Sequence, residues 1–205
     1  SDAQKVRQHL FADMAYQDRM LRFIENHDEP RAAATFTPEK GKMAAVILST
    51  LPGARLFHEG QFEGRKKKVP VFLSRRPDET ADQELIGFYH KLLALTGDGV
   101  FRSGDWKICE VRGWPANQGC RNILAWLWQK DKKSYLIIVN FCDVRSDAMV
   151  QIPLENIRGR DIRLSDELSG ADYERPGTEI ADNGLYAALE PWSCHFFKIV
   201  SPAGA

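Results

Sequence analysis

Several features are scarce in this sequence, and each scarcity excludes a class of protein. The 205 residues include only four cysteines, and no two of them form a Cys-x-x-Cys pair. Disulfide frameworks and cysteine-rich metal clusters need more cysteines at closer spacing. We interpret the four as small buried apolar side chains, with a Cys109–Cys120 disulfide as the alternative. The sequence also has no Asn-x-Ser/Thr acceptor, which favours a cytoplasmic protein.

Long apolar runs and net charge are missing as well. No run approaches the roughly 18 residues that a membrane-spanning helix needs, and the opening SDAQKVRQHL has no signal-peptide core. The 28 basic and 28 acidic side chains cancel, so no overall field attracts nucleic acid or an anionic membrane. We therefore expect neither as a partner. There is also no Gly-x-Ser-x-Gly elbow, phosphate loop or dinucleotide fingerprint.

The first part of the chain, after a helical opening at 4–17, reads as a strand, a helix and a second strand. MLRFI at 20–24 and ARLFH at 54–58 are short apolar runs of the kind found in parallel sheets. Between them, Thr37 offers an N-cap, Pro38 suits the first helical position, and apolar residues recur at helical spacing as far as Pro52-Gly53. This order predicts a βαβ arrangement.

A second helix follows a long polar loop that runs from Gln61 to about Asp78. Thr80 and Gln83 fit a capping box, and Gly97 suits the helix end. The first hundred residues thus read as two successive βα units of a parallel sheet.

The period changes beyond about Gly104. Runs at 123–129 and 134–141 flank the polar KDKK and predict a hairpin, and shorter strand-like runs recur at MVQI, DIRL, LYAAL and CHFFKIV. These patterns predict an antiparallel sandwich, with a domain boundary near residues 97–106.

One short stretch carries chemistry. In RFIENHDEPR (22–31), Asn26, His27 and Asp28 directly follow a predicted parallel strand. Catalytic side chains gather at such carboxyl edges. The alternative is structural, with Asp28 capping a helical turn that Pro30 begins.

RFIENHDEPR resembles the fourth conserved region of the α-amylase family of glycoside hydrolases (family 13 type), where Asn-His-Asp follows the seventh strand of a (β/α)₈ TIM barrel. The downstream order, with LSTLPGARLFHEGQ at the Pro-Gly turn and next strand, is also similar. The resemblance implies an α/β fragment, the last βα units of the barrel (residues 1–100), followed by an all-β antiparallel sandwich domain called domain C (residues 101–205). It departs at Phe62, where family members commonly have an acid.

The resemblance also implies a retaining reaction at α-glucosidic bonds of α-glucans or α-glucosides, by hydrolysis or by transfer. Asp28 corresponds to the carboxylate that stabilises the transition state, and His27 to a sugar-binding residue. Asn26 and Arg31 match the motif and are assigned to the substrate site, with support of the loop as the alternative. No cofactor follows, and a calcium requirement stays open.

In this family the nucleophile and the general acid stand on strands four and five. We therefore expect this chain to be the C-terminal piece of a longer enzyme and to be inactive alone. Two isolated βα units would expose strand edges and a helix face, so we also expect the piece to self-associate or to have a poorly ordered N-terminal part.

Three other patterns in the sequence each allow a functional and a structural interpretation. His27-Asp28 and His58-Glu59 could form a zinc site, although the His-Glu-x-x-His spacing is missing, and the basic run at 65–68 is more typical of a solvated loop than of a nucleic-acid patch. Trp126 and Trp128 share one strand face, which packs in the core between the sheets or, if it faces outward, forms a sugar platform. A non-catalytic sandwich that binds carbohydrate or protein is the alternative function.

Overall fold

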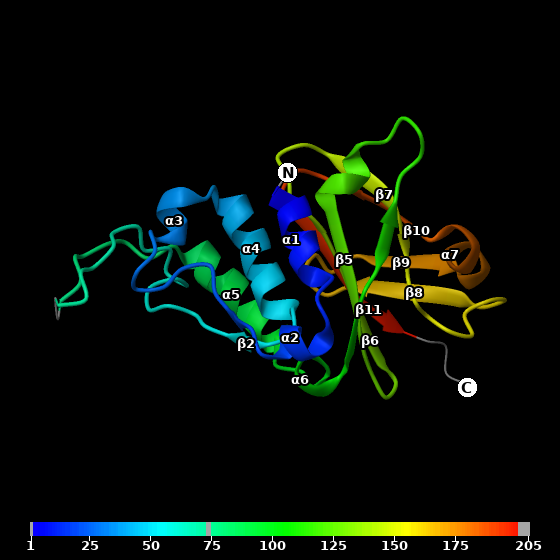
Figure 1. Cartoon of the computed structure of the whole chain (residues 1–205), viewed down its shortest axis with the longest axis horizontal. Helices are drawn as coiled ribbons and strands as arrows, with labels where there is room; N and C mark the ends of the chain where they lie inside the picture. Colours follow the sequence, from blue (N-terminus) through cyan, green and yellow to red (C-terminus); the bar gives the residue numbers. More distant parts are fainter. Residues whose placement is uncertain (1, 73–74, 201–205) are drawn as a thin grey trace. The chain divides into compact units, whose positions relative to one another are not determined.

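The structure, a computed structural model, describes residues 2–72 and 75–200. The chain divides into two compact units. Asp13–Gly97 form one, called here the α/β unit. The other, called the β-rich unit, combines Ser1–Ala12 with Asp98–Ala205. Figure 1 labels most of the helices and strands of the two units. Each unit is described by itself below.

The α/β unit alternates short strands with helices. Its elements are α2 (Met14–Asp18), β1 (Leu21–Arg22), α3 (Ala32–Thr35), α4 (Pro38–Thr50), β2 (Ala54–Arg55) and α5 (Gln83–Thr96). The strands β1 and β2 pair in parallel, with Leu21 opposite Ala54. Parallel neighbours need a crossover connection, which α4 provides. The predicted βα order is therefore confirmed, with strands shorter than the apolar runs suggested.

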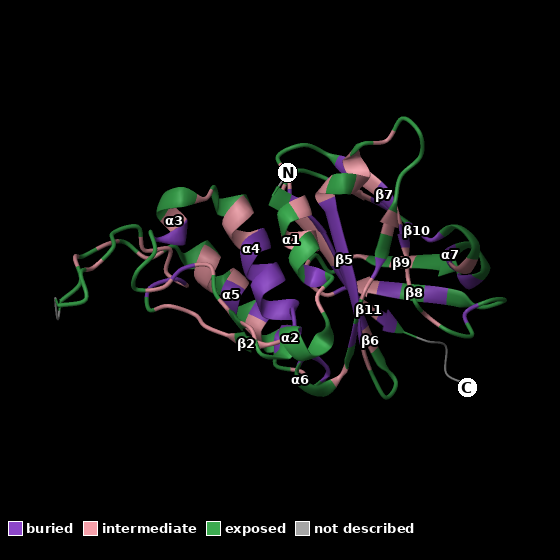
Figure 2. Cartoon of the chain, viewed as in Figure 1, coloured by how far each residue is buried: buried purple, intermediate pink, exposed green. Residues whose placement is uncertain are grey.

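The helix α4 begins where the sequence predicts. The Thr37 hydroxyl accepts a hydrogen bond from the Lys40 backbone N–H at 3.3 Å, and Pro38 occupies the first turn. The C-terminal part of α4, from Met43 to Thr50, is buried, as its colour in Figure 2 shows. The predicted start of α5 is wrong, because Asp82 and not Thr80 is the N-cap, its carboxylate accepting from the backbone of Leu85 at 3.0 Å.

The β-rich unit begins with α1 and continues beyond Gly97 as two antiparallel sheets. Its elements are α1 (Asp2–Leu10), α6 (Val100–Ser103), β3 (Asp105–Ile108), β4 (Glu110–Arg112), the 3₁₀ helix η1 (Gly119–Asn122), β5 (Ile123–Lys130), β6 (Lys133–Asn140), β7 (Ser146–Gln151), β8 (Asp161–Asp166), β9 (Asp172–Pro176), α7 (Gly177–Asn183), β10 (Leu185–Leu189) and β11 (Ser193–Val200). One sheet has the order β10-β7-β4, the other β3-β5-β6-β11-β8-β9. The predicted hairpin is β5–β6, in which Lys130 pairs with Lys133.

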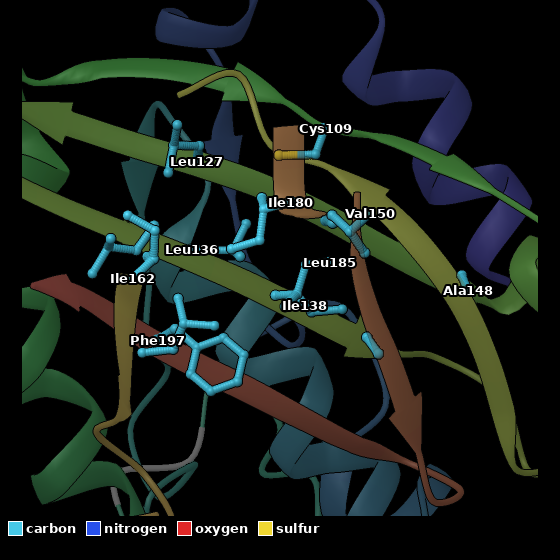
Figure 3. Close-up of a cluster of buried hydrophobic side chains, with 14 of the residues drawn as sticks. Cys109, Leu127, Leu136, Ile138, Ala148, Val150, Ile162, Ile180, Leu185 and Phe197 are labelled. Carbon is cyan, nitrogen blue, oxygen red and sulfur yellow. The ribbon is translucent and has the colours of Figure 1, made fainter. Parts of the chain in front are cut away.

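The core of this unit lies between the two sheets. Alternate residues of β5 and β6 pack with side chains of β7, β10 and α7 (Figure 3). The other face of β5 is buried too, with Trp126 and Trp128 at 0% and 3% exposure and Phe101 of α6 packed 5.9 Å from the Trp128 ring. The two tryptophans are therefore buried and form no surface platform, but the expectation that they pack between the sheets is wrong, because they lie on the opposite face of β5. The predicted fold class, βα units followed by an antiparallel sandwich, is confirmed.

All four cysteines are free thiols, so the alternative Cys109–Cys120 disulfide does not form. Cys109 belongs to the core between the sheets, where burial raises the pKa of its thiol to about 12. None of the helices in the described residues combines the length and the apolar character needed to cross a bilayer.

Candidate functional site

The segment that follows β1 is shaped by Asn26. Its side-chain oxygen accepts hydrogen bonds from the backbone N–H groups of Asp28 at 2.8 Å and Glu29 at 2.9 Å. An asparagine that binds its own backbone two and three residues on forms a tight turn. Asn26 therefore shapes the segment that carries His27 and Asp28, which we call the Asp28 loop (residues 25–31).

His27 and Asp28 stand together at the surface of this loop. The imidazole Nε2 lies 3.2 Å from the Asp28 carboxylate, and the two side chains are 64% and 76% exposed. Asp28 does not cap α3, whose N-cap is Arg31 without a side-chain hydrogen bond. An exposed carboxylate can accept hydrogen bonds from the hydroxyl groups of a ligand, and a neighbouring imidazole can donate one to them. The structural alternative, in which Asp28 caps a helical turn, is therefore wrong.

Arg31, the last residue of the loop, is buried and forms an ion pair with Glu25, the first. Their exposures are 3% and 1%, and Arg31 Nη2 lies 3.0 Å from Glu25 Oε1. The other carboxylate oxygen of Glu25 accepts the backbone N–H of Ala32 at 2.6 Å. The pair thus joins the two ends of the Asp28 loop. Sequence reasoning did not single out Glu25. The signal available for the ion pair was that Glu25 and Arg31, residues of opposite charge, flank Asn-His-Asp in the sequence.

Arg31 also binds the segment that follows β2. It donates to the carbonyl of Glu59 at 2.8 Å and of Arg65 at 3.3 Å, and its Nη1 lies 2.9 Å from Nδ1 of His58. These contacts engage the guanidinium below the surface, while His27 and Asp28 remain above it. Arg31 therefore links the loops after the two parallel strands, as the loop-support alternative expects.

The zinc alternative has no matching geometry. His58 lies 3.5 Å from the buried Glu25 carboxylate, a contact that belongs to the ionic cluster under the loop. In the part of the chain that the structure describes, no group of three or more His, Cys, Asp or Glu side chains is arranged to hold a metal ion. The histidine-carboxylate pairs serve the loops instead.

The basic run at 65–68, in the segment that follows β2, contacts the Asp28 loop. Lys68 donates a hydrogen bond from its ammonium group to the backbone carbonyl of Asp28. The backbone N–H groups of Lys66 and Lys67 donate to Glu79 at 3.0 and 3.3 Å, and the bond from Lys66 is the main reason that the pKa of Glu79 is lowered. The basic run is thus folded back against the Asp28 loop.

Phe62 stands where the family commonly has an acid, and its ring packs between other rings. Its ring centre lies 5.4 Å from that of Phe57 and 4.6 Å from that of Tyr89. Tyr89 is 2% exposed, and its hydroxyl accepts a hydrogen bond from Gln61 at 2.9 Å. Burial raises the pKa of Tyr89 to about 12, against the opposite effect of the Gln61 bond. At position 62 this chain therefore has an aromatic ring packed against two others, and not a charged side chain.

Comparison with known proteins finds likeness in sequence and in fold. The chain is 29% identical over 126 residues to α-amylase MalA of Haloarcula japonica, which is 58% of this chain and 17% of that protein. It superimposes on the maltogenic α-amylase AmyB of Thermotoga neapolitana with a TM-score of 0.69 at 19% identity, covering 98% of this chain and 45% of that one. The α-amylase of Geobacillus thermoleovorans gives 0.68 at 18% identity, covering 98% and 42%. No family model matches the chain.

This chain spans less than half the length of each of these proteins. At these identities the solved structures establish the fold, which is the α/β unit followed by antiparallel sheets. In addition, 126 residues of the chain are similar in sequence to an α-amylase. The chain is therefore related, in sequence and in fold, to α-amylase-family proteins and resembles their C-terminal part.

Proposed function

We propose that this chain supplies part of the active site of an α-amylase-family enzyme that acts on α-glucosidic bonds. Residues 1–100 would form the last βα units of its barrel and residues 101–205 its domain C. The observation that carries the proposal is the exposed Asp28–His27 pair at the carboxyl end of β1, a parallel strand. The related α-amylase of Geobacillus thermoleovorans was crystallised with acarbose, which supports an α-glucan or α-glucoside as substrate.

In this proposal Asp28 steadies the positive charge that develops on the sugar ring. An ionised carboxylate that holds sugar hydroxyls strengthens its hold as the ring flattens, so its contribution is greatest in the transition state. His27 binds a hydroxyl in the same subsite. Asn26 shapes the loop and Arg31 anchors it, so both act on the substrate through Asp28 and His27.

The nucleophile and the general acid are assigned to residues outside these 205. The chain alone is then unable to cleave a glycosidic bond, because both groups take part in every turnover of a retaining enzyme. We also propose that the isolated chain self-associates through the open edge of β1. Leu21 of β1 is 53% exposed and Phe23, directly after the strand, is 41% exposed, and these apolar side chains support that proposal.

The experiment compares this chain with a longer protein that includes the residues encoded upstream. The longer protein is expected to hydrolyse or transfer an α-glucan, and Asp28→Asn is expected to lower kcat by at least about 100-fold, since electrostatic groups of this kind contribute on that scale. The matched control is Asp78→Asn, an exposed aspartate in the loop before α5. Turnover by the 205-residue chain alone, or full activity of the Asp28→Asn enzyme, would contradict the proposal.

The rival function, a sandwich module that binds carbohydrate, loses its best platform. Trp126 and Trp128 are buried in the β-rich unit, so neither can stack on a sugar ring at the surface.

A further inference from the structure

We propose that the α/β unit binds a short α-glucan at a second place, the pocket between the first turns of α4 and α5. The pocket has a volume of about 380 Å³, and all of its lining residues belong to this unit. Its volume lies within the range of about 300–1,000 Å³ usual for small-molecule sites. The ligand class rests on the proposed function, whereas the site is separate from Asp28 and His27, which do not line it.

The apolar part of the wall suits the face of a sugar ring. Phe36 precedes α4 and is partly exposed, and Pro38 and Leu85 line the pocket from the first turns of α4 and α5. The C–H face of a glucose unit packs on such rings and aliphatic groups, while its hydroxyls point sideways. A flat ligand with a polar edge therefore fits this wall better than a compact ion does.

The polar part of the wall offers groups of both signs. Glu39 on the first turn of α4 and Lys66 both line the pocket. Within the described residues, neither the Glu39 carboxylate nor the Lys66 ammonium group has a hydrogen-bond or ion-pair partner, whereas Lys42 pairs with Glu84. Free groups of opposite charge bind hydroxyls by charge-assisted hydrogen bonds and favour neither an anion nor a cation. The lining thus matches a neutral polyhydroxyl ligand.

Two buried polar side chains of the pocket wall are hydrogen-bonded to each other, so neither needs a ligand as its partner. Gln61 and Tyr89, which are 4% and 2% exposed, bond to each other and line the pocket. Ile24 and Ala32, the residues directly before and after the Asp28 loop, are also part of the wall. A sugar bound here lies next to the base of the Asp28 loop, where it could hold an α-glucan beside the proposed active site.

The test is a titration of the 205-residue chain with maltotriose, followed by the backbone NMR signals of Ile24, Ala32 and Leu85. These signals are expected to shift with maltotriose and to stay in place with sorbitol, which has hydroxyls but no ring face. Phe36→Ala is expected to raise the dissociation constant by roughly 2- to 12-fold, the effect of losing one aromatic contact. Phe72→Ala, an 84% exposed phenylalanine outside the pocket, is the matched control.

A second variant, Glu39→Gln, keeps the test decisive if Phe36→Ala fails to fold. It retains the shape of an exposed side chain and is expected to weaken binding as well. Asp28→Asn is expected to leave binding at the pocket unchanged. If Asp28→Asn abolishes the shifts while Phe36→Ala and Glu39→Gln do not, the sugar binds only at the Asp28 loop, which overturns this inference and supports the proposed function. Pocket signals that do not move with maltotriose also overturn it, whereas the proposed function is decided separately by turnover of the longer protein.

Discussion

At the scale of single residues, the Asp28 loop has a buried ion pair at its two ends. Removing a carboxylate and a guanidinium from water is costly, and the attraction between them offsets that cost only when both are present. Glu25 and Arg31 meet this condition, since each has the other within 3.0 Å and both are nearly inaccessible. Their pairing fixes the loop because Glu25 also holds the backbone of Ala32.

We predict that Arg31→Ala lowers the free energy of unfolding of the α/β unit by about 3–5 kcal/mol, because it leaves the Glu25 carboxylate buried without its partner. The measurement is urea unfolding followed by far-UV circular dichroism. Arg76→Ala is the control, since Arg76 and Glu59 form an exposed pair, and it should change the stability by less than about 1 kcal/mol. Equal effects of the two substitutions would show that the Glu25–Arg31 pair has no special weight.

The sequence predicts the exposed residues of this site better than the buried ones. Asn26, His27 and Asp28 stand out because turn formers follow an apolar run, a local pattern. The positions of Glu25 and Arg31 depend on the loop after β2, which is distant in sequence and supplies three of the partners of Arg31. Burial of a charge is decided by such tertiary contacts, which no local pattern contains.

At the scale of elements, helix starts show how local rules compete. Thr80 and Gln83 satisfy the spacing of a capping box, yet α5 begins at Gln83 with Asp82 as its cap. Aspartate is as good an N-cap as serine and better than threonine. In addition, the backbone of Asp82 donates to the carbonyl of Glu63 at 3.1 Å, which fixes it against the preceding loop. A tertiary contact thus selects between two caps that the sequence permits.

We predict that Asp82→Ala destabilises the α/β unit by about 1 kcal/mol, because the Leu85 N–H loses its side-chain acceptor. Thr80→Ala, at an exposed position two residues earlier, should leave the stability unchanged. Urea unfolding followed by far-UV circular dichroism measures both. A loss with Thr80→Ala and none with Asp82→Ala would restore the capping box.

Strands of the β-rich unit were predictable where their apolar runs are long. The runs at 123–129 and 134–141 become β5 and β6, which are buried on both faces. The strand β9 was missed because DYERP is mostly exposed and pairs with a single neighbour, β8, at a sheet edge. The helix α7 was also missed, since only Gly177 and Ile180 of its seven residues are buried and no apolar stripe forms.

At the scale of the whole molecule, the chain order does not match the grouping of the elements. The α/β unit, Asp13–Gly97, is inserted between α1 and the rest of the β-rich unit. The sequence suggested one helix at 4–17, but α1 ends at Leu10 and α2 begins at Met14. The helix α1 contacts η1 and β5, and Arg7 donates to the backbone carbonyls of Cys120 and Ile123.

The hydrogen bonds of Arg7 allow a test of whether α1 belongs to the β-rich unit, because their acceptors lie more than a hundred residues further along the chain. All five tryptophans lie between residues 106 and 192, so tryptophan fluorescence reports only the β-rich unit. We predict that Arg7→Ala lowers the stability measured by this fluorescence in urea by about 1–3 kcal/mol, because the carbonyls of Cys120 and Ile123 lose a charged donor. Lys5→Ala, at an exposed position of the same helix, should change nothing. If Arg7→Ala left the tryptophan transition in place, α1 would not contribute to the stability of the β-rich unit, and the first twelve residues would have to be grouped by chain order after all.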